Sequence, residues 1–171
     1  ELELLRPFAA DLPPGTIEGY ILPEGTPQPL DRPALKRARQ LLEQAGWTVR
    51  DGQLVDAGGR PFRFEILLSL SGSAITTAAE MRQMAEIYGQ ALRNLGITPT
   101  ITLLDSAQYT QRTNTYAFDM TWYDRALSLS PGNEQLLYWG AKGVTEPGTR
   151  NLMGMNSPAA EAMVDAMLQS S

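Results

Sequence analysis

The chain has 171 residues, of which 43% are apolar and 19% charged, and its formal net charge is −5. A chain of this length and composition can bury one hydrophobic core. The negative charge argues against a nucleic-acid partner, because binding to phosphates needs a basic face. Cysteine and histidine are both absent, which excludes disulfides, thiolate metal sites and Ser/His or Cys/His catalysis.

Residues 1–30 contain six prolines and three glycines. Because proline fixes φ and removes a backbone donor, this segment is expected to run as an extended arm. The first residues lack the basic and then apolar pattern of a signal peptide, so either the protein stays in the cytosol or a leader has been removed. No stretch approaches the ~20 apolar residues of a membrane span.

From Asp31 onward, helix and strand patterns alternate. Asp31 is a good N-cap for a helix that Gly46 ends, and Asp51-Gly52 predicts a hairpin turn. Strands are predicted over 62–68, 97–103 and 118–122, because apolar residues alternate or cluster there. Between them, apolar residues at helical spacing predict a long helix ending near residue 95 and a second helix starting after Asp105. This order predicts an α/β fold with a βαβαβ core and at least partly parallel pairing.

Two further helices are predicted near the end of the chain. Ser130-Pro131 and Ser157-Pro158 each place a capping serine before a proline at the first helical position. No dinucleotide fingerprint, P-loop, zinc-protease motif or calcium loop is present, so no cofactor and no metal site is predicted.

The densest polar and aromatic stretch runs from Trp122 to Glu134. It follows a strand and leads into a helix, where α/β folds place their ligands. Asp124 or Glu134 could pair an ammonium group there, and Arg125 could receive a carboxylate. An ordinary strand-to-helix loop with its aromatic residues in the core explains the same pattern, and spacing alone leaves both interpretations open.

Two other classes of function are weighed against ligand binding. A hydrolase would use Asp119 and Asp124 as paired carboxylates, but no nucleophile or base partner lies nearby in the sequence. The more economical interpretation is that Asp119 pairs with an arginine or caps a turn. An interaction module would instead use the proline-rich arm over residues 1–30 as its docking segment.

Four features, taken in order, resemble family-five extracellular solute-binding proteins, which bind oligopeptides and dipeptides. The first feature is the segment 38–47, followed by 51–52 and 56–61. The second is 92–97 and the third is 116–120. The fourth is 130–134 together with 147–152. The sequence of residues 128–135 resembles the branch that handles oligopeptides and peptide-like antibiotics such as microcin C. The similarity runs through the whole chain, but it covers only the later part of a family member.

The resemblance implies one lobe of a class II periplasmic binding protein, with a mixed sheet, that closes on peptide by a hinge. Together with the proline-rich composition of the arm, it divides the chain into the arm, residues 1–30, and the lobe, residues 31–171. The order of family-like motifs and the missing histidine and cysteine also predict no enzymatic activity. The expected partners are an oligopeptide or peptide-like ligand, the first lobe of the same polypeptide and an ABC permease, and the expected location is the periplasm. A single lobe lacks the ligand contacts that the other lobe provides. This chain alone is therefore expected to fold yet bind peptide weakly or not at all.

The family's acidic group for the ligand's N-terminus points to Asp124 or Glu134, and the choice stays open. The full set of candidate ligand-binding residues lies on two loops: Trp122, Asp124, Arg125, Ser128, Asn133, Glu134, Arg150 and Asn151.

Overall fold

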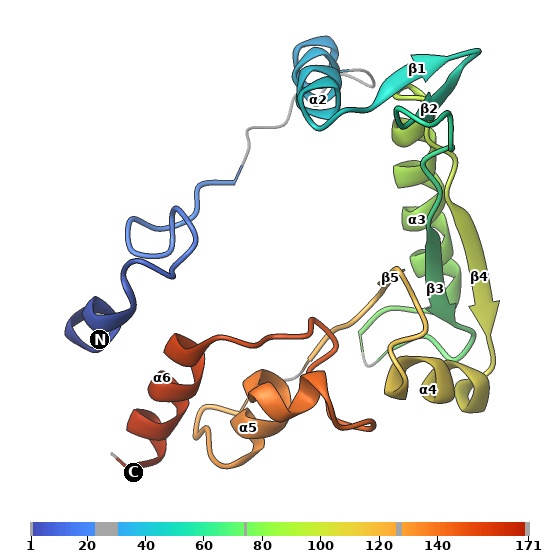
Figure 1. Ribbon diagram of the computed structural model, residues 1–171. Coiled ribbons are helices and arrows are strands. Elements are labelled where there is room, and N and C mark those ends of the chain that lie inside the picture. Colours follow the sequence, from blue (N-terminus) through green and yellow to red (C-terminus); the bar gives the residue numbers. More distant parts are fainter. Residues whose placement is uncertain (1, 23–30, 74, 126–127, 170–171) are drawn as a thin grey trace. The chain divides into compact units, whose positions relative to one another are not determined.

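The computed structural model describes residues 2–22, 31–73, 75–125 and 128–169 (Figure 1). The chain forms two compact units, which are treated in turn. The sheet unit comprises residues 24–110 and 118–125, and the helical unit comprises residues 1–23, 111–117 and 126–171. The predicted boundary between arm and lobe, after residue 30, falls at the end of a segment that lies outside the described residues, so it stays a prediction.

A three-stranded parallel sheet forms the centre of the sheet unit. Its strands are β3 (Glu65–Ser69), β4 (Thr100–Leu104) and β5 (Met120–Thr121), in the order β4-β3-β5. Ile66 of β3 pairs with Ile101 on one side and Met120 on the other. This arrangement confirms the predicted α/β class and the βαβαβ order. Pairing is parallel throughout this described sheet, and antiparallel pairing occurs in a separate hairpin.

The hairpin and the helix before it follow the sequence signals closely. Helix α2 (Arg32–Gln44) begins as predicted, because Asp31 Oδ1 accepts a hydrogen bond from the Ala34 amide at 2.9 Å. Strands β1 (Thr48–Arg50) and β2 (Gln53–Val55) are joined by a two-residue turn in which both residues have positive φ. Asp-Gly favours that turn, so the prediction is confirmed.

Helix α3 (Ala78–Arg93) covers one face of the sheet. Met81 and Ala85 of this helix pack against Ile66 and Leu68 of β3 and form one apolar cluster. A second apolar cluster joins α2 to the hairpin through Leu54, Leu95 and Ile97. Strand β3 is buried on both faces, because Leu67, which alternates with Ile66 and Leu68, is 0% exposed.

The first turn of α3 is fixed by reciprocal hydrogen bonds between Thr77 and Glu80. The Glu80 amide donates to Thr77 Oγ1, while Glu80 Oε2 accepts from both the Thr77 hydroxyl and the Thr77 amide. The hydroxyl bond, followed by the amide bond, holds the pKa of the Glu80 carboxyl below its usual range.

Replacing Thr77 by alanine is expected to lower the free energy of unfolding by about 1 kcal/mol, because one cap is lost. Because the pKa of Glu80 is lowered in the folded state, the ionised carboxylate stabilises the fold at pH values above its ordinary pKa of 4.5. This stabilisation is lost as the pH falls through the lowered pKa. Urea denaturation at neutral and acidic pH measures both effects. The exposed Thr98, which caps no helix, provides the matched alanine control, and an equal loss in the two variants would contradict the prediction.

Helix α4 (Ser106–Asn114) starts at the predicted position, because Asp105 Oδ1 accepts from the Ala107 and Gln108 amides. Tyr109 of α4 ties the helix to β5: its hydroxyl lies 3.0 Å from the Trp122 carbonyl oxygen and 2.9 Å from Thr121 Oγ1. The Thr121 hydroxyl in turn donates to the carbonyl of Leu67. Hydroxyl groups thus link α4 to the middle of the sheet.

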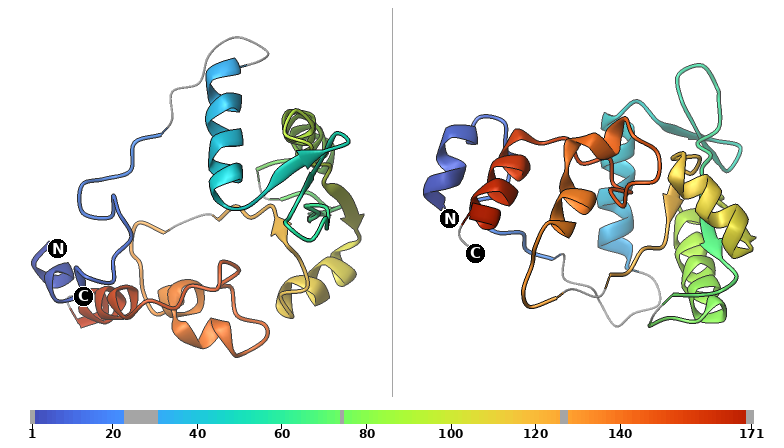
Figure 2. Two further views of the ribbon diagram at one scale, coloured as in Figure 1. Left: turned by 45° about the horizontal axis from the view of Figure 1, so that its top comes forward. Right: turned by 90° about the horizontal axis from the view of Figure 1, so that it is seen from below.

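The helical unit contains α1 (Leu2–Leu5), α5 (Glu134–Trp139), α6 (Pro158–Gln169) and two short 3₁₀ helices over residues 6–8 and 141–144. Helix α6 lies beside both α1 and α5 in the two views of Figure 2. Among the described residues, no helix has both the length and the apolar character needed to cross a bilayer.

Two expectations for the helical unit need correction. Residues 2–8 are helical instead of extended, because Pro7 stands in the first turn of its 3₁₀ helix, where a missing amide costs nothing. Helix α5 starts at Glu134, after the predicted Ser130-Pro131 start, because the Glu134 side chain folds back onto the Gly132 amide. Helix α6 begins where Ser157-Pro158 predicted.

Candidate ligand site at the carboxyl edge of the sheet

The carboxyl ends of the three parallel strands bring three loops to one edge of the sheet unit. β3 and β4 run in the same direction and end next to α4 (Figure 1). The segments 69–73, 105–106 and 122–125 therefore meet at this edge, which is where open α/β sheets bind ligands. Hydroxyl groups predominate there: Ser71 Oγ lies 2.5 Å from Ser106 Oγ.

Asp124 is the acidic group of this edge. Its side chain is half-buried, and Oδ2 accepts a hydrogen bond from the Ser73 hydroxyl at 2.5 Å. Within the described residues, Oδ1 has no hydrogen-bond partner. A carboxylate that is held by one oxygen and open at the other can receive a ligand's ammonium group.

Trp122 and Arg125 flank Asp124. Both side chains are half-buried, and Trp122 packs against the cluster formed by α3 and β3. The indole ring lines an apolar groove of about 210 Å³ beside α3, and its buried Nε1 has no hydrogen-bond partner among the described residues. The structure thus places three of the predicted ligand-binding residues at the carboxyl edge of the sheet unit.

Sequence reasoning missed the hydroxyl groups of this edge, namely Ser71, Ser73, Ser106 and Tyr109. Ser71 and Ser73 stand a few residues after the predicted strand over 62–68, so the sequence holds a signal for them. The predicted order of strands and helices would have placed their loop beside the one after the third strand.

The remaining candidates lie in the helical unit. Ser128 and Asn133 are exposed, and Ser128 Oγ accepts from the Ser130 amide at 3.0 Å. Glu134 Oε1 accepts from the Gly132 amide at 2.9 Å and from the Gln135 side chain at 3.2 Å. These bonds, with the Gly132 amide as the largest cause, hold the pKa of Glu134 below its usual range. The Glu134 carboxylate is therefore engaged within its own turn.

Arg150 and Asn151 have different environments although they are adjacent. Arg150 is exposed, and its guanidinium donates to the Tyr138 hydroxyl at 2.9 Å and lies 5.7 Å from the centre of that ring. Asn151 is 0% exposed, and its side chain bonds the Gly140 carbonyl and both backbone groups of Met155. Asn151 thus holds the loop that presents Arg150.

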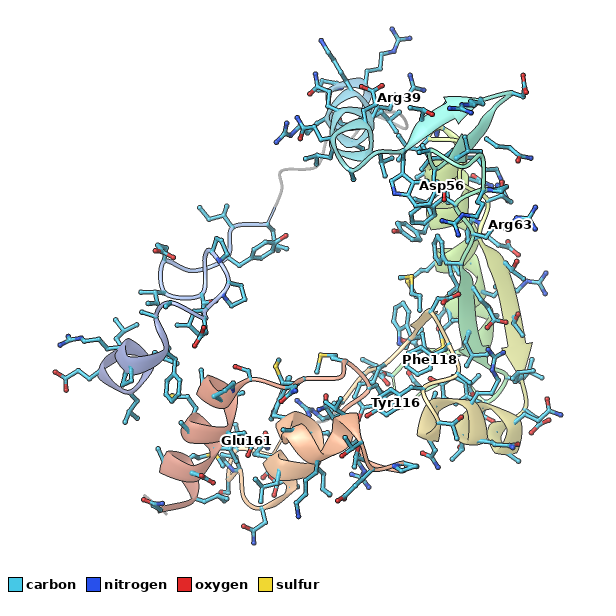
Figure 3. All side chains as sticks on the ribbon, viewed as in Figure 1. Arg39, Asp56, Arg63, Tyr116, Phe118 and Glu161 are labelled. Atoms are coloured by element: carbon cyan, nitrogen blue, oxygen red, sulfur yellow. The ribbon has the colours of Figure 1, made fainter. Side chains whose placement is uncertain are left out.

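Tyr116, which lies 35 residues before Asn151, also stabilises the loop that contains Asn151. Its hydroxyl bonds the carbonyl oxygens of Gly143 and Asn151. Figure 3 labels Tyr116 and also Glu161, a residue of α6 whose carboxylate accepts a hydrogen bond from the Ala141 amide. The loops of the helical unit are therefore stabilised by buried and half-buried polar contacts.

Asp119 and Asp124 lie at opposite ends of β5. Asp119 precedes the strand, and its Oδ2 accepts a hydrogen bond from the Glu65 amide at 2.9 Å. This bond holds the start of β3 in place, so Asp119 has a structural role. The described residues contain no group of three or more acidic side chains that could hold a metal ion.

Comparison with known proteins identifies the family. Residues 8–146 match the model for bacterial extracellular solute-binding proteins, family 5 middle. The chain belongs to this family. A putative binding protein from Brucella melitensis is 38% identical over 98% of this chain, and a probable peptide-binding protein from Agrobacterium fabrum is 34% identical over 96%. This family-5 chain spans 26% of the length of each of these relatives.

The fold of this family-5 chain is also found in solved structures. The oligopeptide-binding protein AppA from Bacillus subtilis, solved with a nonapeptide, superposes with a TM-score of 0.60 at 19% identity. The superposition covers 77% of this chain and 25% of that protein. The predicted family and the fold of a class II periplasmic binding protein are therefore confirmed.

Proposed function

We propose that the full-length protein binds oligopeptides or peptide-like compounds in the periplasm and delivers them to an ABC importer, with this chain forming part of the binding lobe. Membership in the solute-binding family supports binding, and the Agrobacterium relative, named as a probable peptide-binding protein, supports the choice of peptide. The first lobe of the same polypeptide and the permease are the proposed partners.

Asp124 carries this proposal. A peptide's free amino group is a cation with three donors, so it needs an acceptor that is charged and not already fully used. Each acid keeps one oxygen without a hydrogen bond among the described residues, but Asp124 lies at the carboxyl edge of the sheet, where α/β folds bind ligands, whereas Glu134 is bonded within its own turn in the helical unit. We therefore assign the amine to Asp124 and a structural role to Glu134.

The other candidate residues also divide into those that can contact the ligand and those that support the structure. Arg125 and Arg150 supply guanidinium groups for carboxylates or carbonyl oxygens of the ligand. Trp122 supplies apolar surface, and Ser128 and Asn133 supply exposed hydrogen-bonding groups. Asn151 supports the loop instead of contacting ligand, because its side chain is buried and hydrogen-bonded to the backbone of Gly140 and Met155.

We also propose that the protein has no catalytic activity toward its ligand. A paired-carboxylate hydrolysis needs two acids that face the same bond, whereas Asp119 and Asp124 flank opposite ends of β5. Bound peptide should therefore be recovered intact by mass spectrometry after prolonged incubation with the full-length protein.

Titration calorimetry of the full-length protein tests the amine assignment. Native mass spectrometry first identifies the peptides that copurify with the protein. For such a peptide, Asp124→Asn is expected to weaken affinity by about 10- to 100-fold, because a charged hydrogen bond is lost. Glu134→Gln is the matched control and should change affinity by less than about threefold. Equal losses in both variants, or the absence of any bound peptide, would refute the proposal.

A further inference from the structure

We propose that Ser73 is a positioning residue that fixes the Asp124 carboxylate, and that this contact sets the preference for ligands with a free amino group. The proposal rests on the function proposed above, in which Asp124 receives the amine. It concerns a loop that precedes Asp124 by about fifty residues and lies at the same edge of the sheet.

Backbone contacts hold Ser73 in place. Gly72 has φ +70°, and a Cβ there would lie 2.7 Å from the carbonyl oxygen of Thr76. The Ser73 amide donates to that same carbonyl at 2.8 Å, and the Thr76 amide donates back to Ser73 Oγ at 3.0 Å. The next residue, Thr77, caps α3. These bonds anchor Ser73 to the residue that precedes the cap of α3.

The direction of the Ser73 hydroxyl follows from these bonds. Since Oγ already accepts from Thr76, its single hydrogen goes to one of two acceptors, Asp124 Oδ2 at 2.5 Å or the Thr76 carbonyl at 3.4 Å. The shorter bond to the charged oxygen is the stronger one. Ser73 therefore donates to Oδ2 and leaves Oδ1 for a ligand.

Fixing the carboxylate in advance increases affinity for an amine. An unheld aspartate side chain would lose rotamer freedom on binding, whereas the Ser73 bond has already restricted Asp124. Loss of the hydroxyl is expected to reduce the preference for amine-bearing ligands by about 3- to 10-fold. A ligand without the amine gains nothing from this preorganisation, so its binding should not change.

Competitive capture by the full-length protein tests this inference. The probes are a pool of random-sequence pentapeptides and the same pool after N-acetylation, with captured peptides quantified by native mass spectrometry. The variants are Ser73→Ala, Ser73→Thr, Asp124→Asn and the double variant Ser73→Ala with Asp124→Asn. The threonine variant keeps the hydroxyl and serves as the conservative rescue.

The expected result is a preference for the free-amine pool that falls in Ser73→Ala, is restored in Ser73→Thr, and falls no further when Ser73→Ala is added to Asp124→Asn. An unchanged preference in Ser73→Ala, with a loss in Asp124→Asn, would overturn the role of Ser73 and leave the proposed function standing. An equal loss of both pools in Ser73→Ala would also overturn it, since that indicates damage to the fold. A wild-type protein without preference, or without capture, would overturn the proposed function as well.

Discussion

Replacing Leu67 by alanine is expected to lower the free energy of unfolding of this chain by about 3 kcal/mol, within the range for leucine truncations in protein cores. Leu67 lies in the central strand β3, between β4 and β5, and is 0% exposed. The truncation loses the transfer free energy of the removed methyl groups and leaves a cavity in a tightly packed region.

Urea denaturation followed by circular dichroism measures this effect. Leu70 provides a matched control, because it lies three residues after Leu67, directly after the end of β3, and its side chain is 56% exposed. Leu70→Ala should change stability by less than about 0.5 kcal/mol. If the two variants lost similar stability, the placement of Leu67 at the centre of the sheet unit would be wrong.

Replacing Asn151 by alanine is expected to lower the free energy of unfolding by about 3 kcal/mol. This loss of stability concerns the helical unit. The change leaves the buried Gly140 carbonyl and both backbone groups of the half-buried Met155 without their side-chain partner. Repacking does not remedy this, because buried backbone groups need a hydrogen bond.

Hydrogen exchange read at individual amides separates this effect from unfolding elsewhere. The Met155 amide, which donates to Asn151 Oδ1 at 2.8 Å, should exchange faster in Asn151→Ala, while amides of β3 stay protected. Asn156 is exposed and lies in the same loop, so Asn156→Ala is the control and should leave exchange unchanged. Unchanged protection of Met155 in Asn151→Ala would contradict the assigned role.

The fold of the sheet unit could be predicted because its signals are local. Asp31 and Asp105 cap helices through hydrogen bonds to amides two or three residues away, and Asp51-Gly52 forms its turn within a hairpin. Periodic apolar residues then fixed the order of strands and helices, and that order calls for parallel pairing. Each of these inferences needs only a short stretch of sequence.

The contacts of the candidate site could not be predicted in the same way, because they join distant residues. Ser73 and Asp124 are 51 residues apart and come together only through the pairing of β3 with β5. Tyr116 reaches the loop of Asn151 across 35 residues. The start of α5 also escaped prediction, since the Glu134 side chain bonds a preceding amide that the Ser-Pro pattern does not indicate.

We propose that Asp124, held by Ser73, receives the amino group of a peptide ligand. A crystal structure of the full-length protein with a copurified peptide would show which group binds the ligand's amine. We expect the ligand nitrogen within about 3 Å of Asp124 Oδ1, with the Ser73 hydroxyl still on Oδ2. An amino group bound by Glu134 or by an acid outside this edge, with Asp124 away from the ligand, would contradict the claim.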